Sequence, residues 1–145
     1  RHRRVLDLKT EILALAKKQN CQILNKVEKN TKVFAIEAYL DSIILNFLTN
    51  AIKYKSPNRL PIIKISSHEE SGFVILRIED NGLGIDLKKN GKKLFTLNGT
   101  FHNHSDSRGI GLFITKNHVE SIGGKIEVES KVDEGTVFSI YFKKV

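Results

Sequence analysis

The chain has 145 residues, of which 40% are apolar and 28% are charged, and this composition is that of a soluble globular protein, most simply one domain covering residues 1–145. No stretch approaches the roughly 20 apolar residues of a membrane-spanning helix, and the single cysteine, Cys21, excludes an internal disulfide. The net charge of +8 favours an anionic ligand or partner. No stripe of aromatic residues alternates with these charges, so we expect no nucleic-acid partner.

The first residue of the chain bears on whether it is part of a longer protein, and its cysteine bears on the redox compartment. The chain begins with Arg1 and contains no methionine, so we expect a domain of a longer protein whose other parts carry some of its partners. Nothing around Cys21 indicates an activated thiol, and we expect a buried structural cysteine in a reducing compartment.

Apolar spacing predicts three substantial helices, at residues 10–18, 40–56 and 109–121. We expect a short edge strand at residues 3–8, and further strands at residues 22–28, 32–36, 62–68, 73–79, 125–130 and 136–142. The last four of these strands form two hairpins. This order predicts an α/β (α+β) two-layer sandwich, with a mixed, mostly antiparallel sheet of about five or six strands covered on one face by the three helices.

The second helix carries an unusual set of polar side chains. An amide oxygen is a hard, neutral ligand that suits a partly hydrated Mg²⁺ on phosphates, and a lysine supplies a point charge for those phosphates. An amphipathic helix with incidental asparagines explains the pattern equally well. The apolar face holds Leu40, Ile44, Phe47, Leu48 and Ala51, and the polar arc holds Asn46, Asn50, Lys53 and Tyr54.

Asp80 ends a predicted strand and is followed by Gly82 and Gly84. Glycine has no Cβ, so a flat ring can approach the backbone there, and the carboxylate can accept hydrogen bonds from an exocyclic amine such as that of adenine. A plain Asp-Asn-Gly turn is the alternative.

The third helix begins in a glycine-containing segment, Arg108-Gly109-Ile110-Gly111-Leu112. Free N–H groups at a helix start form an anion site when glycines let phosphate oxygens come close, and an arginine adds a charged fork. A helix start with a purely structural role explains the segment equally well. The polar segment before it lacks periodicity, and a loop of that length is usually functional or mobile.

In this order, the segments resemble the catalytic and ATP-binding domain of sensor histidine kinases, within the GHKL group of ATPases. The resemblance covers nearly the whole chain. The N box is similar to residues 46–54, the first glycine box to 80–84, the F box to 93–95, the second glycine box to 109–112, and the closing hairpin to residues 123–136.

The resemblance implies that Asn50 ligates Mg²⁺, assisted by Asn46 one turn earlier, and that Lys53 and Arg108 contact phosphate. Asn46, Lys53 and Arg108 would then be the catalytic residues. Other GHKL proteins carry a glutamate where this chain has Asn46, so slow hydrolysis and transfer to a protein nucleophile are expected. The family's second glycine box often begins with small residues where this chain has Ser107 and Arg108. Because of this departure, the resemblance does not establish that the lid closes.

The resemblance also implies the base contacts. Asp80 would hydrogen-bond the adenine amino group, helped by Thr136 through water, while Gly82 and Gly84 leave room for the base. Residues 88–108 would form a mobile ATP lid with Phe95 as its hydrophobic latch. The remaining cofactor-binding residues would be Tyr54, Ile85, Leu94, Phe95, Gly109, Ile110, Gly111 and Leu112.

None of the five histidines lies in the His-[Asp/Glu]-Leu-Arg setting typical of the family's phosphoacceptor. They are His2, His68, His102, His104 and His118. His102 and His104 are expected in the lid rather than on zinc, and His118 at the surface or in packing. The acceptor is therefore expected upstream, outside this chain.

The resemblance thus implies a protein histidine kinase whose domain binds Mg·ATP and transfers the γ-phosphoryl group to a histidine on a separate dimerisation domain, for relay to a response regulator. It implies a cytoplasmic domain that is monomeric alone and dimeric in the full-length protein, and leaves open whether the parent is an inner-membrane sensor. The alternatives are a GHKL serine kinase that binds a sigma factor and a non-catalytic nucleotide-binding module.

Overall fold

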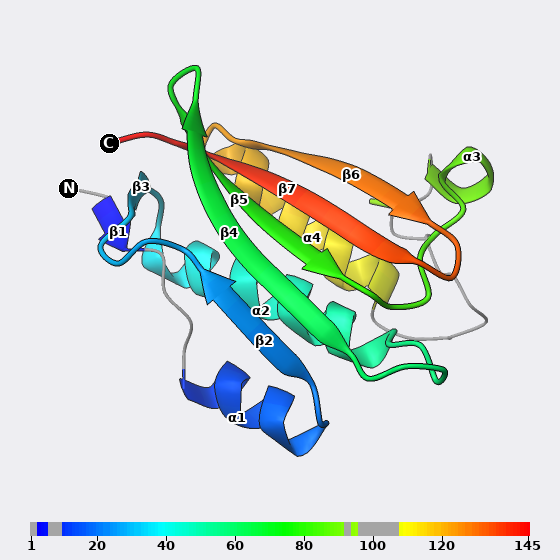
Figure 1. Cartoon of the computed structure of the whole chain (residues 1–145). Helices are drawn as coiled ribbons and strands as arrows, with labels where there is room; N and C mark the ends of the chain where they lie inside the picture. The colour runs from blue at the N-terminus through cyan, green and yellow to red at the C-terminus, as the bar shows by residue number, and fades with distance from the viewer. Residues whose placement is uncertain (1–2, 6–9, 92–93, 96–107) are drawn as a thin grey trace.

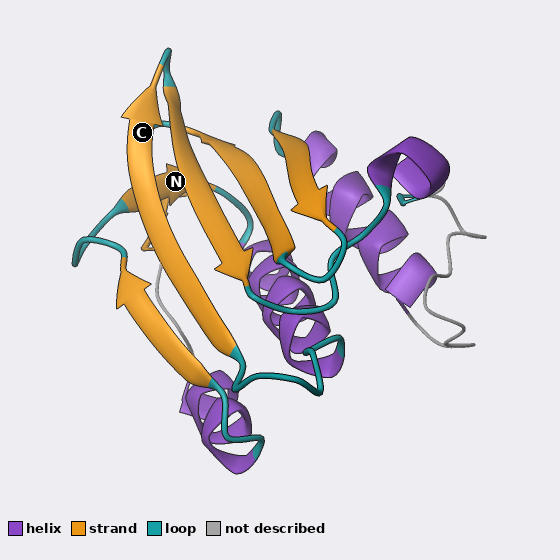
Figure 2. Ribbon diagram, turned by 45° about the vertical axis from the view of Figure 1, so that its right-hand side comes forward, coloured by secondary structure: helices purple, strands orange, loops and turns teal. Residues whose placement is uncertain are grey.

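The computed structural model describes residues 3–5, 10–91, 94–95 and 108–145, and it has two layers. Figures 1 and 2 show a twisted sheet with helices on one of its faces only. The helices are α1 (Thr10–Lys18), α2 (Glu37–Lys53), the short α3 (Leu87–Asn90) and α4 (Arg108–Ser121). Among the described helices, none is both long and apolar enough to cross a membrane.

The main sheet has five strands in the order β2-β4-β5-β7-β6. Its members are β2 (Gln22–Lys26), β4 (Ile62–Glu70), β5 (Phe73–Asp80), β6 (Lys125–Lys131) and β7 (Gly135–Lys143). Only the β2–β4 pair is parallel, and the other three pairs are antiparallel. The structure therefore confirms the mixed, mostly antiparallel sheet with helices on one face.

The core lies between α2 and the sheet. One side of α2 is fully buried, because its apolar residues recur at helical spacing. The ring of Phe47 packs against Phe138 of β7, with centroids 4.7 Å apart. The buried residues of α2 are Leu40, Ile43, Ile44, Phe47, Leu48, Ala51 and Ile52.

Two of the predicted strands lie outside the main sheet. β1 (Arg3–Val5) and β3 (Lys32–Phe34) pair with each other in a separate two-stranded sheet, so the run at residues 32–36 does not extend the main one. An alternating pattern shows which side chains are buried but not which strand lies alongside.

The bounds of α2 also differ from the prediction, since it spans Glu37–Lys53 rather than residues 40–56. Tyr54 caps the helix with φ −101° and ψ 30°, and its carbonyl accepts a hydrogen bond from Leu83 N–H at 3.0 Å. This tertiary contact ends the helix before Pro57 does. Similarly, the segment expected as a loop from residue 88 begins inside α3, where the Asp86 side chain accepts a hydrogen bond from Lys89 N–H at 3.2 Å.

Candidate functional site

Helices α2 and α4 run in opposite directions, and this arrangement brings the predicted phosphate-binding residues together. Ile36 at the start of α2 lines the same cavity as the end of α4, and Asn46 contacts Thr115 near the middle of each helix. The last turn of α2, with Asn50 and Lys53, therefore lies at the end where α4 begins. The backbone of Arg108 to Gly111 forms the first turn of α4, as predicted.

Asn46 makes a contact that the sequence did not indicate. Its Nδ2 donates a hydrogen bond to Thr115 Oγ1 at 2.8 Å, and Thr115 is completely buried. The amide nitrogen of Asn46 thus ties α2 to α4, leaving the amide oxygen as the atom that can face a ligand. Asn50 follows one helical turn later on the same side and is only partly buried.

Asp80 lies at the end of β5, and the turn that follows it meets the end of α2. Asp80 Oδ1 accepts a hydrogen bond from Gly82 N–H at 2.9 Å, while Leu83 N–H donates to the carbonyl of Tyr54. Across the sheet, Asp80 is paired in register with Thr136 of β7. The structure therefore brings Asp80, Thr136 and the end of α2 together at one end of the sheet, as the predicted nucleotide site requires.

Ser130 of β6 joins the segment after β5 to the start of β7, and no sequence motif indicated it. Its hydroxyl accepts from Ile85 N–H and donates to the carbonyl of Gly135, both at 2.8 Å, and it lies 2.8 Å from Thr136 Oγ1. A serine hydroxyl carries one proton, so with that proton on Gly135 the threonine hydroxyl donates to Ser130. Thr136 Oγ1 then presents acceptor lone pairs, which suit a donor such as an amino group or water.

The glycines near Asp80 permit close approaches between backbone segments. A Cβ at Gly82 would lie 2.6 Å from the carbonyl oxygen of Tyr54, and one at Gly84 would lie 2.0 Å from that of Lys131. Gly135 packs against Asp80 itself, where a Cβ would lie 2.0 Å from the Asp80 carbonyl oxygen. These contacts give the glycines a packing requirement in addition to the predicted role of leaving room for a base.

A depression of about 370 Å³ borders Asp80, Ser130 and Thr136, and it also reaches Arg77 and Glu79. Its lining is mostly polar and charged, as expected where a strand ends at solvent. Arg77 and Glu79 form an exposed ion pair there, with 3.4 Å between Arg77 Nη2 and Glu79 Oε1.

The family described as histidine kinase-, DNA gyrase B-, and HSP90-like ATPase matches residues 35–145. The chain belongs to this ATPase family.

The relatives of this ATPase domain include sensor proteins. The chain is 34% identical over 126 residues to the sensor protein RprX of Bacteroides fragilis, a match that covers 83% of this chain and 24% of that protein. It is 35% identical over 114 residues to the sensor histidine kinase YcbM of Bacillus subtilis, covering 77% of this chain and 36% of the relative. The chain thus spans about a quarter to a third of the length of these two relatives.

Solved structures support the fold of the ATPase domain. The catalytic domain of histidine kinase ThkA superimposes with a TM-score of 0.74 at 25% identity, covering 92% of this chain and 88% of that one. The two-layer architecture is therefore that of a histidine kinase catalytic domain.

Two of the predicted F-box residues, Leu94 and Phe95, belong to the core or pack against it. Leu94 is fully buried, and the ring of Phe95 lies 6.3 Å from that of Phe138 in an edge-to-face arrangement. Lys116 Nζ lies 5.9 Å from the centroid of the Phe95 ring. Ile85 and Leu112, two other predicted cofactor-binding residues, are also almost completely buried and belong to the core.

Lys53 and Tyr54 lie at the end of α2 in the ATPase domain, with different exposure. Tyr54 is buried and Lys53 is exposed, with Lys53 Nζ 5.8 Å from the centroid of the Tyr54 ring. An exposed ammonium at this helix end suits contact with a phosphate tail.

Other predictions concern residues that were not expected to bind the nucleotide. Cys21 is buried as predicted, and burial raises the pKa of its thiol while Lys55 opposes part of that effect. The ring of His118 stacks on Tyr39 with centroids 4.3 Å apart, which confirms a packing role. His2, His102, His104, Ser107 and most of the segment predicted as a lid lie outside the described residues.

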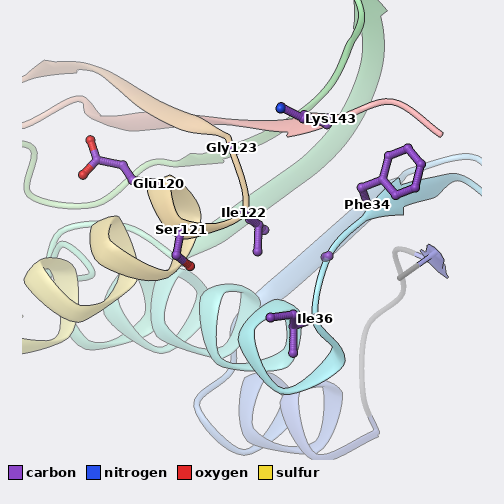
Figure 3. A pocket seen from close by; sticks show the side chains of 8 residues that line it. Phe34, Ile36, Glu120, Ser121, Ile122, Gly123 and Lys143 are labelled. Carbon is purple, nitrogen blue, oxygen red and sulfur yellow. The ribbon is translucent and has the colours of Figure 1, made fainter. Parts of the chain in front are cut away.

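The ATPase domain has a second cavity, of about 490 Å³, at the opposite end of α2 and α4 (Figure 3). Phe34 and Ile36 lie on one side of it, and Ser121 and Ile122 on the other. None of the predicted nucleotide-binding residues lines this cavity.

Proposed function

We propose that this chain is the ATP-binding and catalytic domain of a sensor histidine kinase. It binds Mg·ATP and donates the γ-phosphoryl group to a histidine on a separate dimerisation domain of the full-length protein, for relay to a response regulator. One observation carries the proposal: Asp80 and Thr136 lie beside the last turn of α2 at one end of the sheet. The fold in which they meet is shared with histidine kinase catalytic domains.

Each part of the chain has a distinct task in this reaction. Asp80 accepts a hydrogen bond from the adenine amino group, and the Thr136 hydroxyl supports the same end of the nucleotide. Lys53 and the N–H groups of the first turn of α4 hold the phosphates. The bond from the γ-phosphorus to ADP breaks as a bond to the histidine nitrogen forms, so the protein contributes position and charge.

Asn50 is the residue that would hold Mg²⁺. Its amide is partly exposed in the last turn of α2, and amide oxygens are among the hard ligands that Mg²⁺ accepts while it keeps several waters. When bound, the ion neutralises charge on the phosphates. Asn46 donates to Thr115 and so positions α2 against α4, with its amide oxygen left to assist.

The relatives favour transfer to histidine over transfer to serine, because two of them carry the names of a sensor protein and a sensor histidine kinase. The two chemistries are separable, since phosphohistidine is labile in acid and stable in alkali, whereas phosphoserine shows the reverse.

The test is phosphorylation of the full-length protein with γ-labelled ATP and Mg²⁺. We expect an acid-labile phosphoprotein, and we expect Asp80→Asn and Asn50→Ala each to reduce its formation by about tenfold or more, since each removes a hydrogen bond or ligand to charged groups. Asp86→Asn and Asn58→Ala are matched controls: asparagine caps α3 as well as aspartate does, and Asn58 is exposed beyond α2. An acid-stable product, or full activity in both site variants, would contradict the proposal.

A further inference from the structure

The Arg59 side chain donates hydrogen bonds to three backbone carbonyls, which belong to two separate turns beside the site. Its Nε donates to the Asn81 carbonyl at 2.6 Å, and its Nη2 donates to Gly82 at 2.8 Å and to Asp133 at 2.5 Å. Asn81 and Gly82 belong to the turn after β5, whereas Asp133 belongs to the turn between β6 and β7. One side chain thus joins both turns that border Asp80.

The contacts of Arg59 fix two consecutive peptide groups at both of their ends. In the peptide between Asn81 and Gly82, the carbonyl is held by Arg59 and the N–H by Asp80 Oδ1 at 2.9 Å. In the next peptide, the carbonyl is again held by Arg59, and the N–H of Leu83 donates to Tyr54 at 3.0 Å. The orientation of the first peptide sets where the Asp80 carboxylate points.

The turn also holds the segment that carries Arg59. Asn81 Nδ2 donates to the Leu60 carbonyl at 3.0 Å, and Asn81 Oδ1 accepts from Ile62 N–H at 2.9 Å. The connection between α2 and β4 and the turn after β5 therefore hold each other, with Arg59 reaching in one direction and Asn81 in the other.

We propose that Arg59 is a positioning residue for adenine recognition, acting through Asp80 without touching the nucleotide. This inference rests on the proposed function. A guanidinium suits the task because it is always charged and presents donors in a rigid planar fork that can span several carbonyls. A lysine at this position has one compact ammonium and reaches fewer of them.

The test compares Arg59→Gln, Arg59→Lys and Arg77→Gln by calorimetric titration with adenosine, ADP and Mg·ATP, alongside thermal unfolding of each variant. Arg77 is a matched control, because it has the same charge and borders the same depression as Asp80, but its described partner is Glu79 of its own strand and not a carbonyl of either turn. Asp80→Asn provides the reference for loss of base recognition.

We expect Arg59→Gln to weaken adenosine, ADP and Mg·ATP by a similar factor of about ten, since charge-assisted hydrogen bonds that orient the carboxylate are lost. Arg59→Lys should fall between it and the wild type, and Arg77→Gln should bind as the wild type does. A purely structural role would lower the unfolding temperature without this common factor across the three ligands.

Several results would overturn the inference. One is wild-type affinity in Arg59→Lys and Arg59→Gln, and another is a loss confined to the ligands that carry phosphates. If Arg59→Gln does not fold, Arg59→Lys decides alone: an affinity equal to that of the wild type contradicts the inference. Failure of the wild type to bind any of the three ligands would instead contradict the proposed function.

Discussion

The amide of Asn46 shows how a residue in a ligand-binding pattern can also hold the fold together. Its nitrogen bonds the buried hydroxyl of Thr115, 69 positions away in the sequence. Asn46 and Asn50 look alike in the sequence pattern, yet their tasks differ: Asn46 fixes the spacing of α2 and α4, while Asn50 is placed nearer to the site edge. The geometry of the proposed phosphate-binding end depends on this cross-link.

We predict that Thr115→Val destabilises the chain by about 1 kcal/mol, because valine keeps the shape but leaves Asn46 Nδ2 without its acceptor. Denaturant unfolding measures the change. Thr49→Val is the control, since the bonds of the Thr49 hydroxyl to described residues go to carbonyls of its own helix, those of Leu45 and Asn46. This substitution should change stability by less than about 0.5 kcal/mol. Equal effects of the two substitutions would show that the bond between the helices contributes nothing.

At the residue scale, the sequence indicated Asp80, Asn50 and Lys53 because each lies within a short motif of fixed spacing. It gave no sign of Arg59 or Ser130, whose partners lie up to 74 positions away along the chain for Arg59 and 45 for Ser130. Contacts over such separations depend on which strands pair, and local pattern does not contain that information.

At the element scale, the turns beside the site depend on backbone segments that nearly touch. Gly84 has φ +73°, and the carbonyl of Lys131 occupies the space where a Cβ would be. Gly72, in the turn between β4 and β5, has a similar φ of +84° but open space around it. The two glycines therefore separate the cost of the backbone conformation from the cost of the close approach.

Gly72→Ala should destabilise the chain by about 1 kcal/mol, the cost of a left-handed conformation for an L-residue. Gly84→Ala should cost at least about 2 kcal/mol more, because its methyl group forces the turn after β5 away from Lys131. Chemical denaturation of both variants measures the difference. If Gly84→Ala is no more destabilised than Gly72→Ala, then the two turns do not pack as tightly as described.

The elements that the sequence predicted well are those with long periodic patterns. The helices α1, α2 and α4 and the hairpins β4–β5 and β6–β7 appear where expected, within a few residues. The short runs were less informative, since β1 and β3 pair with each other outside the main sheet. A three-residue strand has too little pattern to identify its partner.

At the scale of the whole molecule, the residues of the candidate site meet because α2 and α4 run in opposite directions and β5 and β7 are antiparallel. α2 finishes where α4 begins, and β5 finishes where β7 begins (Figure 1). Periodicity indicated that one face of each helix is buried, but not which helix it packs against. The convergence of these residues was inferred from the family resemblance, and the described geometry is consistent with it.

The most direct measurement is a crystal structure of the chain with Mg²⁺ and a non-hydrolysable ATP analogue. The account predicts the adenine amino group within about 3 Å of the Asp80 carboxylate, with the phosphates between the last turn of α2 and the first turn of α4. A base bound elsewhere, for example in the cavity lined by Phe34 and Ile36, would contradict it.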